Sequence, residues 1–110
     1  NLINRIKIQS SSSLIKLYLE RNNIQQIKIE FFKGLVKMNK LYIERNLIKV
    51  IEPYSFQNLI NLEELNLGFQ NLVDLLPCTF YGLENLNWLL INNNNLNMLK
   101  NFTFIGLKQV

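Results

Sequence analysis

The sequence predicts an α/β-type repeat solenoid, in which copies of one short unit stack on one another. Four phenylalanines recur every 24 residues, at Phe32, Phe56, Phe80 and Phe104. Six further apolar columns keep the same interval, and they start at Leu14, Leu17, Leu19, Ile24, Ile27 and Leu35. Hydrophobic residues make up 48% of the chain, which excludes a disordered protein. A fixed period of this length, in a chain able to pack, is typical of a solenoid.

The first half of each copy predicts one short β-strand. Leu17 and Leu19 alternate with polar or variable residues, which is the pattern of a strand with one buried face. Copies stacked in register would join these strands into a parallel sheet on the concave face. Mostly irregular loops are expected on the convex side.

Asparagine follows the strand in three copies, at Asn22, Asn46 and Asn94. An asparagine side chain there can bind backbone groups that the turn would otherwise bury without partners. The third copy has Gln70 in this column, which predicts a less regular turn.

The return limb of each copy carries proline and glycine. Pro53 and Pro77 stand three residues before their phenylalanines, where they are expected to prevent a second strand from pairing. The residue before the last leucine column is expected to be left-handed, and it is Gly34, Asn58, Gly82 or Gly106.

These motifs resemble the leucine-rich repeat family. Leu65-Asn-Leu67 and the stretch from Leu17 to Ile24 are similar to its strand and asparagine turn, and 51–62 is similar to the second half of its "typical" 24-residue subclass. The resemblance implies a horseshoe and, for this subclass, extracellular receptors or matrix proteins.

The expected domain organisation is a single leucine-rich repeat array over 1–110. It comprises the tail of a preceding repeat and four full repeats, at 1–13, 14–37, 38–61, 62–85 and 86–109. Neither end supplies a polar cap of the kind that solenoids need, so the chain is expected to be a fragment flanked by further repeats.

Residues suited to catalysis are scarce, and we expect no enzyme, cofactor or metal site. The chain has no histidine and one cysteine, Cys78, which favours a packing residue over a reactive thiol. Glu20 and Glu44 share a column, and paired carboxylates can cleave glycosides. Arg21 and Arg45 follow them directly, which favours a balanced charge ladder instead.

The concave face is the candidate binding surface. Strand alternation places two tyrosines amid mixed charges in the first two copies and large apolar residues in the last two. Clustered exposed aromatic residues indicate a binding site, although another part of a longer protein could cover them. The candidate contacts for a protein or peptide ligand are Tyr18, Arg21, Tyr42, Arg45, Phe69, Trp88 and Leu90.

Charge is uneven along the chain. Residues 1–50 hold ten of the twelve basic and three of the eight acidic residues, a net charge of +7, while 51–110 carry −3. A basic half suggests nucleic acid. However, Lys28, Lys33, Lys37 and Lys49 are expected on loops, and Glu20 interrupts the concave face. We therefore expect a protein partner with an acidic zone and no nucleic acid.

The expected setting is extracellular or at the cell surface, and the alternative is a cytoplasmic scaffold or regulatory protein. Asn101-Phe102-Thr103 is a glycosylation sequon, which makes Asn101 the candidate glycan site of a secreted glycoprotein. No apolar run approaches the ~20 residues that cross a bilayer, so no direct membrane insertion of this segment is expected.

Overall fold

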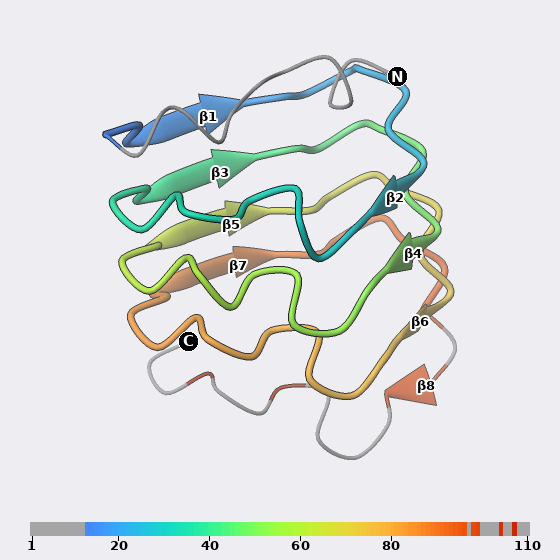
Figure 1. Cartoon of the computed structure of the whole chain (residues 1–110). Helices are drawn as coiled ribbons and strands as arrows, with labels where there is room; N and C mark the ends of the chain where they lie inside the picture. The colour runs from blue at the N-terminus through green and yellow to red at the C-terminus, as the bar shows by residue number, and fades with distance from the viewer. Residues whose placement is uncertain (1–12, 97, 100–103, 105–106, 108–110) are drawn as a thin grey trace.

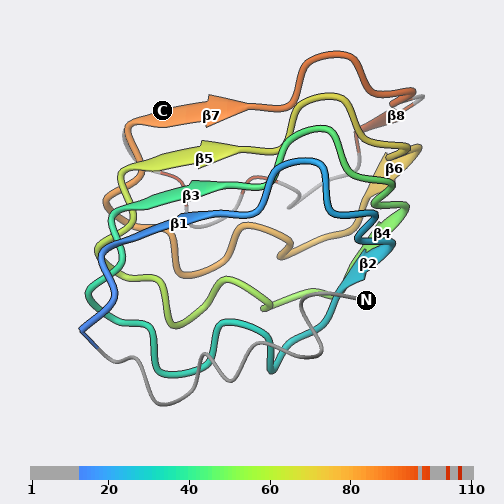
Figure 2. The same ribbon diagram turned by 90° about the horizontal axis from the view of Figure 1, so that it is seen from above.

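The computed structural model describes residues 13–96, 98–99, 104 and 107. Within this range the chain winds as a regular coil, and each turn lies against the next (Figures 1 and 2). The predicted tail of a preceding repeat, residues 1–13, lies outside the description except for its last residue. Gly106 and the sequon at Asn101 also lie outside it.

A four-stranded parallel sheet forms one side of the coil, in the order β1-β3-β5-β7 (Figure 1). Its strands are β1 (Lys16–Tyr18), β3 (Lys40–Tyr42), β5 (Glu64–Asn66) and β7 (Trp88–Leu90). Leu17 pairs with Leu41, Leu41 with Leu65 and Leu65 with Leu89, so neighbouring strands are offset by one 24-residue period. The predicted solenoid with one parallel strand per repeat on this face is confirmed.

A second row of strands was not predicted. It comprises β2 (Gln26–Ile27), β4 (Val50–Ile51), β6 (Asp74–Leu75) and β8 (Met98–Leu99), paired as β2-β4 and β6-β8. The prediction that prolines prevent a second strand from pairing is therefore wrong. Pro53 and Pro77 follow β4 and β6 after one intervening residue, where the missing N–H limits the length of the pairing. No helix in the described part of the chain is long and apolar enough to span a membrane.

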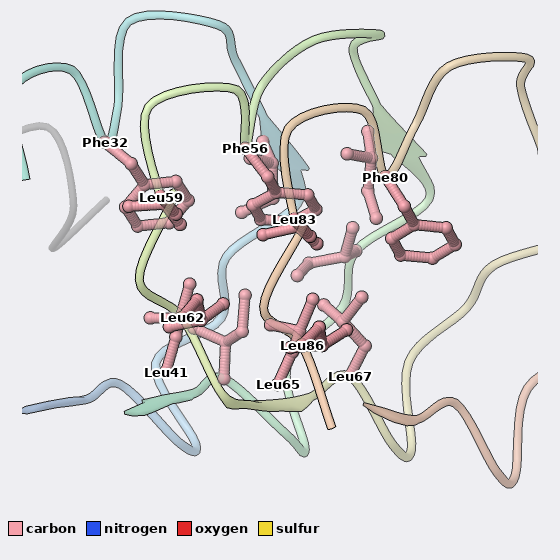
Figure 3. Close-up of a cluster of buried hydrophobic side chains, with 14 of the residues drawn as sticks. Phe32, Leu41, Phe56, Leu59, Leu62, Leu65, Leu67, Phe80, Leu83 and Leu86 are labelled. Carbon is pink, nitrogen blue, oxygen red and sulfur yellow. The ribbon is translucent and has the colours of Figure 1, made fainter. Parts of the chain in front are cut away.

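The core is a continuous stack between the sheet and the opposite loops. Phe32, Phe56 and Phe80 are completely buried, and their rings lie nearly parallel to their neighbours (Figure 3). Ring centroids are 5.9 Å apart for the first pair and 6.3 Å for the second, and Phe104 continues the stack at 5.6 Å. Buried leucines such as Leu41 and Leu65 fill the space toward the sheet (Figure 3). The phenylalanine column therefore forms the predicted spine.

The asparagine column links consecutive turns. The Asn46 amide nitrogen donates to the Leu19 and Ile43 carbonyls at 3.0 and 2.8 Å, and its oxygen accepts from the Asn22 and Ile24 amides at 2.7 and 3.0 Å. Asn46 is almost fully buried. Its side chain therefore supplies partners to backbone groups of two repeats, as the sequence predicts.

Gln70 makes the same connection between repeats as the asparagines, but it lacks the bond to the carbonyl three residues back that Asn22, Asn46 and Asn94 make. The expected irregularity is therefore limited to this bond within the turn. The Gln70 amide nitrogen donates to the Ile43 carbonyl at 2.6 Å and its oxygen accepts from the Ile48 amide at 3.2 Å. Asn94 binds Leu67 and Leu72 in the same way one repeat later. A glutamine amide has the same donors and acceptor as asparagine, and the longer side chain still reaches them.

The left-handed positions match the prediction only in part. Gly34 and Gly82 have φ of 84° and 100°, and a Cβ on Gly82 would lie 2.5 Å from the Gln57 Cα. Asn58 does not adopt this conformation, so that prediction is wrong; the left-handed residues of its repeat are Arg45 and Tyr54, with φ of 58° and 67°. The Leu59 amide still reaches the Phe56 carbonyl at 3.0 Å, so the turn closes without the strained conformation at Asn58.

Phe80→Ala is expected to lower the free energy of unfolding by about 3–5 kcal/mol, because it removes a fully buried ring and leaves a cavity in the stack. Chemical denaturation measures this change. Tyr81→Ala is the matched control, since its ring is 47% exposed, and should cost about 1 kcal/mol or less. Equal losses in the two variants would show that the spine does not carry the stability.

Asn46→Ala is expected to destabilise the protein by about 3 kcal/mol, since it leaves buried amides and carbonyls of two turns without partners. Thermal or urea unfolding provides the measurement. Asn61→Ala removes a single exposed bond to the Val36 carbonyl and should change stability by about 0.5 kcal/mol or less. A small effect at Asn46, comparable with that at Asn61, would refute the structural role of this column.

Candidate functional site

The outward side of the β1-β3-β5-β7 sheet is the concave face predicted as the binding surface. In each strand the central leucine points into the core, so the residues on either side of it point outward. Tyr18 and Trp88 are 50% and 42% exposed, and Tyr42 and Leu90 are half-buried. The strands thus place four of the seven candidate residues on one surface.

Three aromatic rings form a cluster across this face, which we call the aromatic platform: Tyr18, Tyr42 and Trp88. The Tyr18 and Tyr42 rings meet edge to face with centroids 5.2 Å apart. Tyr42 also approaches Trp88, at 6.3 Å, although β5 lies between their strands. The Tyr42 side chain therefore extends over β5, and the platform spans all four strands.

Glu64 on β5 fixes the position of Tyr42. The Tyr42 hydroxyl donates a hydrogen bond to one carboxylate oxygen of Glu64, and the Lys40 ammonium lies 3.3 Å from the other. This hydrogen bond is the main cause that raises the pKa of Tyr42 to about 12, with burial and the charge of Glu64 adding to it. The same bond, helped by Lys40, lowers the pKa of Glu64. The platform thus has an ionised carboxylate within it at neutral pH.

The residue three positions after each strand has a left-handed backbone conformation. This left-handed column contains Arg21, Arg45 and Phe69. Their φ angles are 60°, 58° and 57°, and Asn93 continues the column at 56°. The backbone amides of this column bond to the next repeat, from Arg21 to Glu44, from Arg45 to Gly68 and from Phe69 to Asn92. These bonds hold non-glycine residues in a conformation that costs about 1–2 kcal/mol each.

Arg45 and Phe69 form a second contact on the concave face. The Arg45 guanidinium carbon lies 4.0 Å from the centroid of the Phe69 ring, a cation–π geometry. Phe69 remains 39% exposed. The candidate residues thus fall into two groups, the aromatic platform with Leu90 beside it and the Arg45–Phe69 pair, rather than a single apolar patch.

Amide side chains occupy the area beside Gly68. A Cβ on Gly68 would lie 2.7 Å from the Asn92 side-chain oxygen and 3.2 Å from that of Asn66, so any larger residue would displace them. Asn66 accepts from the Gly68 amide at 3.0 Å. This part of the face offers hydrogen-bonding groups beside the aromatic ones.

The sequence did not predict several features of the site. The left-handed column carries arginine and phenylalanine, which give no signal for that conformation. The roles of Glu64 and Lys40 were also missed, because a repeat period does not specify contacts between side chains of neighbouring strands. Among the described residues, no group of three or more His, Cys, Asp or Glu side chains could hold a metal ion.

Cys78 lies away from the concave face, in the loop after β6. It is half-buried, unpaired and left-handed, and its carbonyl accepts from the amides of Tyr54 and Tyr81 at 3.1 and 3.3 Å. A hydrogen bond with the Cys78 thiol raises the pKa of Tyr54. Cys78 therefore takes part in the packing between the loops of neighbouring repeats.

The Leucine rich repeat family model matches residues 12–72, more than half of the chain. The chain belongs to the leucine rich repeat family. Among solved structures 43 chains match, including the crystal structure of a TLR13–ssRNA13 complex, with a TM-score of 0.87 and 32% sequence identity. That match covers 93% of this chain and 15% of the TLR13 chain. No curated protein sequence matches significantly.

The TLR13 match bears on two predictions from the sequence. This leucine-rich repeat array is similar to part of a protein crystallised with ssRNA13. The prediction that excluded nucleic acid as a partner therefore finds no support in the comparison. The resemblance to a leucine-rich repeat protein is confirmed.

Glu64→Gln is expected to lower the pKa of Tyr42 from about 12 toward the ordinary value of about 10, because it removes the carboxylate that holds the phenolic proton. Absorbance titration, with Tyr42→Phe to identify the signal, measures it. The raised pKa stabilises the folded state below about pH 10, and this contribution is lost as pH rises through 12.

Glu63→Gln provides the matched control, since Glu63 is exposed on the neighbouring position and should leave the titration unchanged. If Glu64→Gln gives the same titration curve as the parent protein, Glu64 does not hold Tyr42.

Proposed function

We propose that this array binds a protein or peptide ligand across its concave face, as a non-catalytic part of a larger cell-surface receptor or secreted protein. The observation that supports this most strongly is the aromatic platform of Tyr18, Tyr42 and Trp88, two of whose rings are more than 40% exposed. Large rigid aromatic side chains contribute much contact area for little loss of conformational entropy. Such residues dominate the energetics of interfaces.

Charges around the platform favour a ligand with an acidic zone. Lys16, Arg21 and Arg45 surround the first two repeats of the face, and Arg45 is held against Phe69. Glu64 is already paired with Lys40 and Tyr42. The arginines would act mainly through the rate of association and the register of the complex, as charged groups at interfaces generally do.

Single-stranded nucleic acid is the second candidate, and the TLR13–ssRNA13 structure is the observation that favours it. Aromatic side chains beside a basic groove are the usual means of binding unpaired bases. Against it, Glu20, Glu44 and Glu64 all lie on or beside the same face. A cytoplasmic scaffold with the same concave surface is the alternative setting for a protein ligand.

Trp88→Ala in the full-length protein is expected to weaken ligand binding by about 2 kcal/mol, because the ring is a large exposed anchor of the platform. Its cost in stability should stay near 1 kcal/mol, since its ring contact is with Tyr42 alone among the described aromatic residues. A photo-crosslinking amino acid at position 92, which is exposed on the same face, would first identify the ligand, which is then titrated.

Tyr81→Ala serves as the control, since its exposed ring lies in the loop between β6 and β7. Each titration is repeated at two salt concentrations. A steep loss of affinity with salt, together with sensitivity to Lys16 and Arg21, would favour nucleic acid instead. If Trp88→Ala binds the ligand with wild-type affinity, the concave face is not the binding site.

A further inference from the structure

A hollow opens on a different side of the solenoid, between the second and third repeats. Its volume is about 200 Å³, and its lining consists of Lys49, Val50, Ile51, Val73, Asp74 and Leu76. It lies between β4 and β6, which pack together but belong to separate two-stranded sheets. The second row of strands is thus divided between β4 and β6, which lie next to each other along the solenoid (Figure 1).

The rim of the hollow is apolar and exposed. Val50 and Val73 are 48% and 43% exposed, although both are β-branched residues in or beside a strand. In the same columns of the first repeat the chain has Gln25 and Gln26, which are polar. The exposed valines are therefore a local feature of the two repeats that form the hollow.

Opposite charges stand on the two walls and do not neutralise each other. Lys49 and Asp74 are both exposed, and within the described part of the chain neither forms an ion pair. The 24-residue offset places Lys49 in the column of Val73, and Val50 in the column of Asp74. The four residues line the same hollow, and in the repeat columns they occupy the corners of a square, with the valines on one diagonal and the charges on the other.

We infer that this square is a self-complementary contact between two copies of the chain. In an isologous dimer the two-fold axis lies in the plane of the interface. An axis along the valine diagonal places each valine against the same valine of the partner copy. It also places Lys49 against the partner's Asp74, and Asp74 against the partner's Lys49. An axis parallel to a side of the square would instead place each valine against a charged residue.

The contact is a weak and reversible one. Stable dimers bury about 800 Å² on each partner, and the square forms only the centre of such an area. Burial of the valines supplies attraction, while the two symmetric ion pairs set the orientation and are weakened by salt. The residues of the hollow are not those of the concave face, so a ligand there and the partner copy do not compete for the same side chains.

Charge reversal in the full-length protein tests this pairing by sedimentation equilibrium over a concentration series. Lys49→Asp sets acid against acid at both symmetric contacts, and Asp74→Lys sets base against base. Each variant alone should raise the dimer dissociation constant about ten-fold or more. An equimolar mixture should regain a constant within about three-fold of wild type, because the heterodimer has two attractive contacts.

Lys37→Asp and Glu84→Lys make the same charge changes at exposed positions that do not line the hollow, and they should leave the wild-type constant unchanged. Recovery in the mixture also requires both single variants to be folded, so loss of structure cannot imitate the expected result. A wild-type protein that stays monomeric throughout the series overturns the inference. The inference is also overturned if the equimolar mixture fails to associate, or if the control variants weaken the dimer as much as Lys49→Asp and Asp74→Lys do.

Discussion

A buried or half-buried side-chain amide joins each of three described repeats to the repeat before it, and the position of the other residues depends on this link. The carbonyls of Leu19, Ile43 and Leu67 each accept a hydrogen bond from the amide side chain one repeat further on. The same three side chains accept from the amides of Ile24, Ile48 and Leu72. Because these backbone groups are removed from water, leaving them unpaired would be costly. The ladder therefore fixes one translation between neighbouring repeats.

This fixed translation explains why the concave face has a defined arrangement. Each strand has only three residues, too few to hold a register by themselves. The phenylalanine stack on one side and the amide ladder on the other hold every strand at the same offset. Residues 24 positions apart then lie side by side across the sheet, as Tyr18 and Tyr42 do. Tyr42 also reaches Trp88, which stands in the neighbouring column. The aromatic platform is a consequence of the stacking, although its rings lie outside the core.

Features that repeat could be predicted from the sequence, and features that do not repeat could not. The period revealed the spine, the strands and the turn asparagines because each column is sampled several times. Gln70 looked like a defect because residue identity alone does not show that its longer side chain reaches the same groups. The contact of Glu64 with Tyr42 and the cover of Phe69 by Arg45 occur once each. They depend on side-chain directions in two particular neighbours, about which a column pattern carries no information.

Trp88 allows direct observation of whether the concave face is the surface that meets a ligand. Trp88 is the only tryptophan in the sequence, so intrinsic tryptophan fluorescence of this array comes from the aromatic platform alone. Acrylamide quenching would be measured on the array with and without saturating ligand. Ligand is expected to lower the quenching constant several-fold, because a bound partner covers a ring that is 42% exposed in the free protein. An unchanged quenching constant at saturation would contradict this expectation.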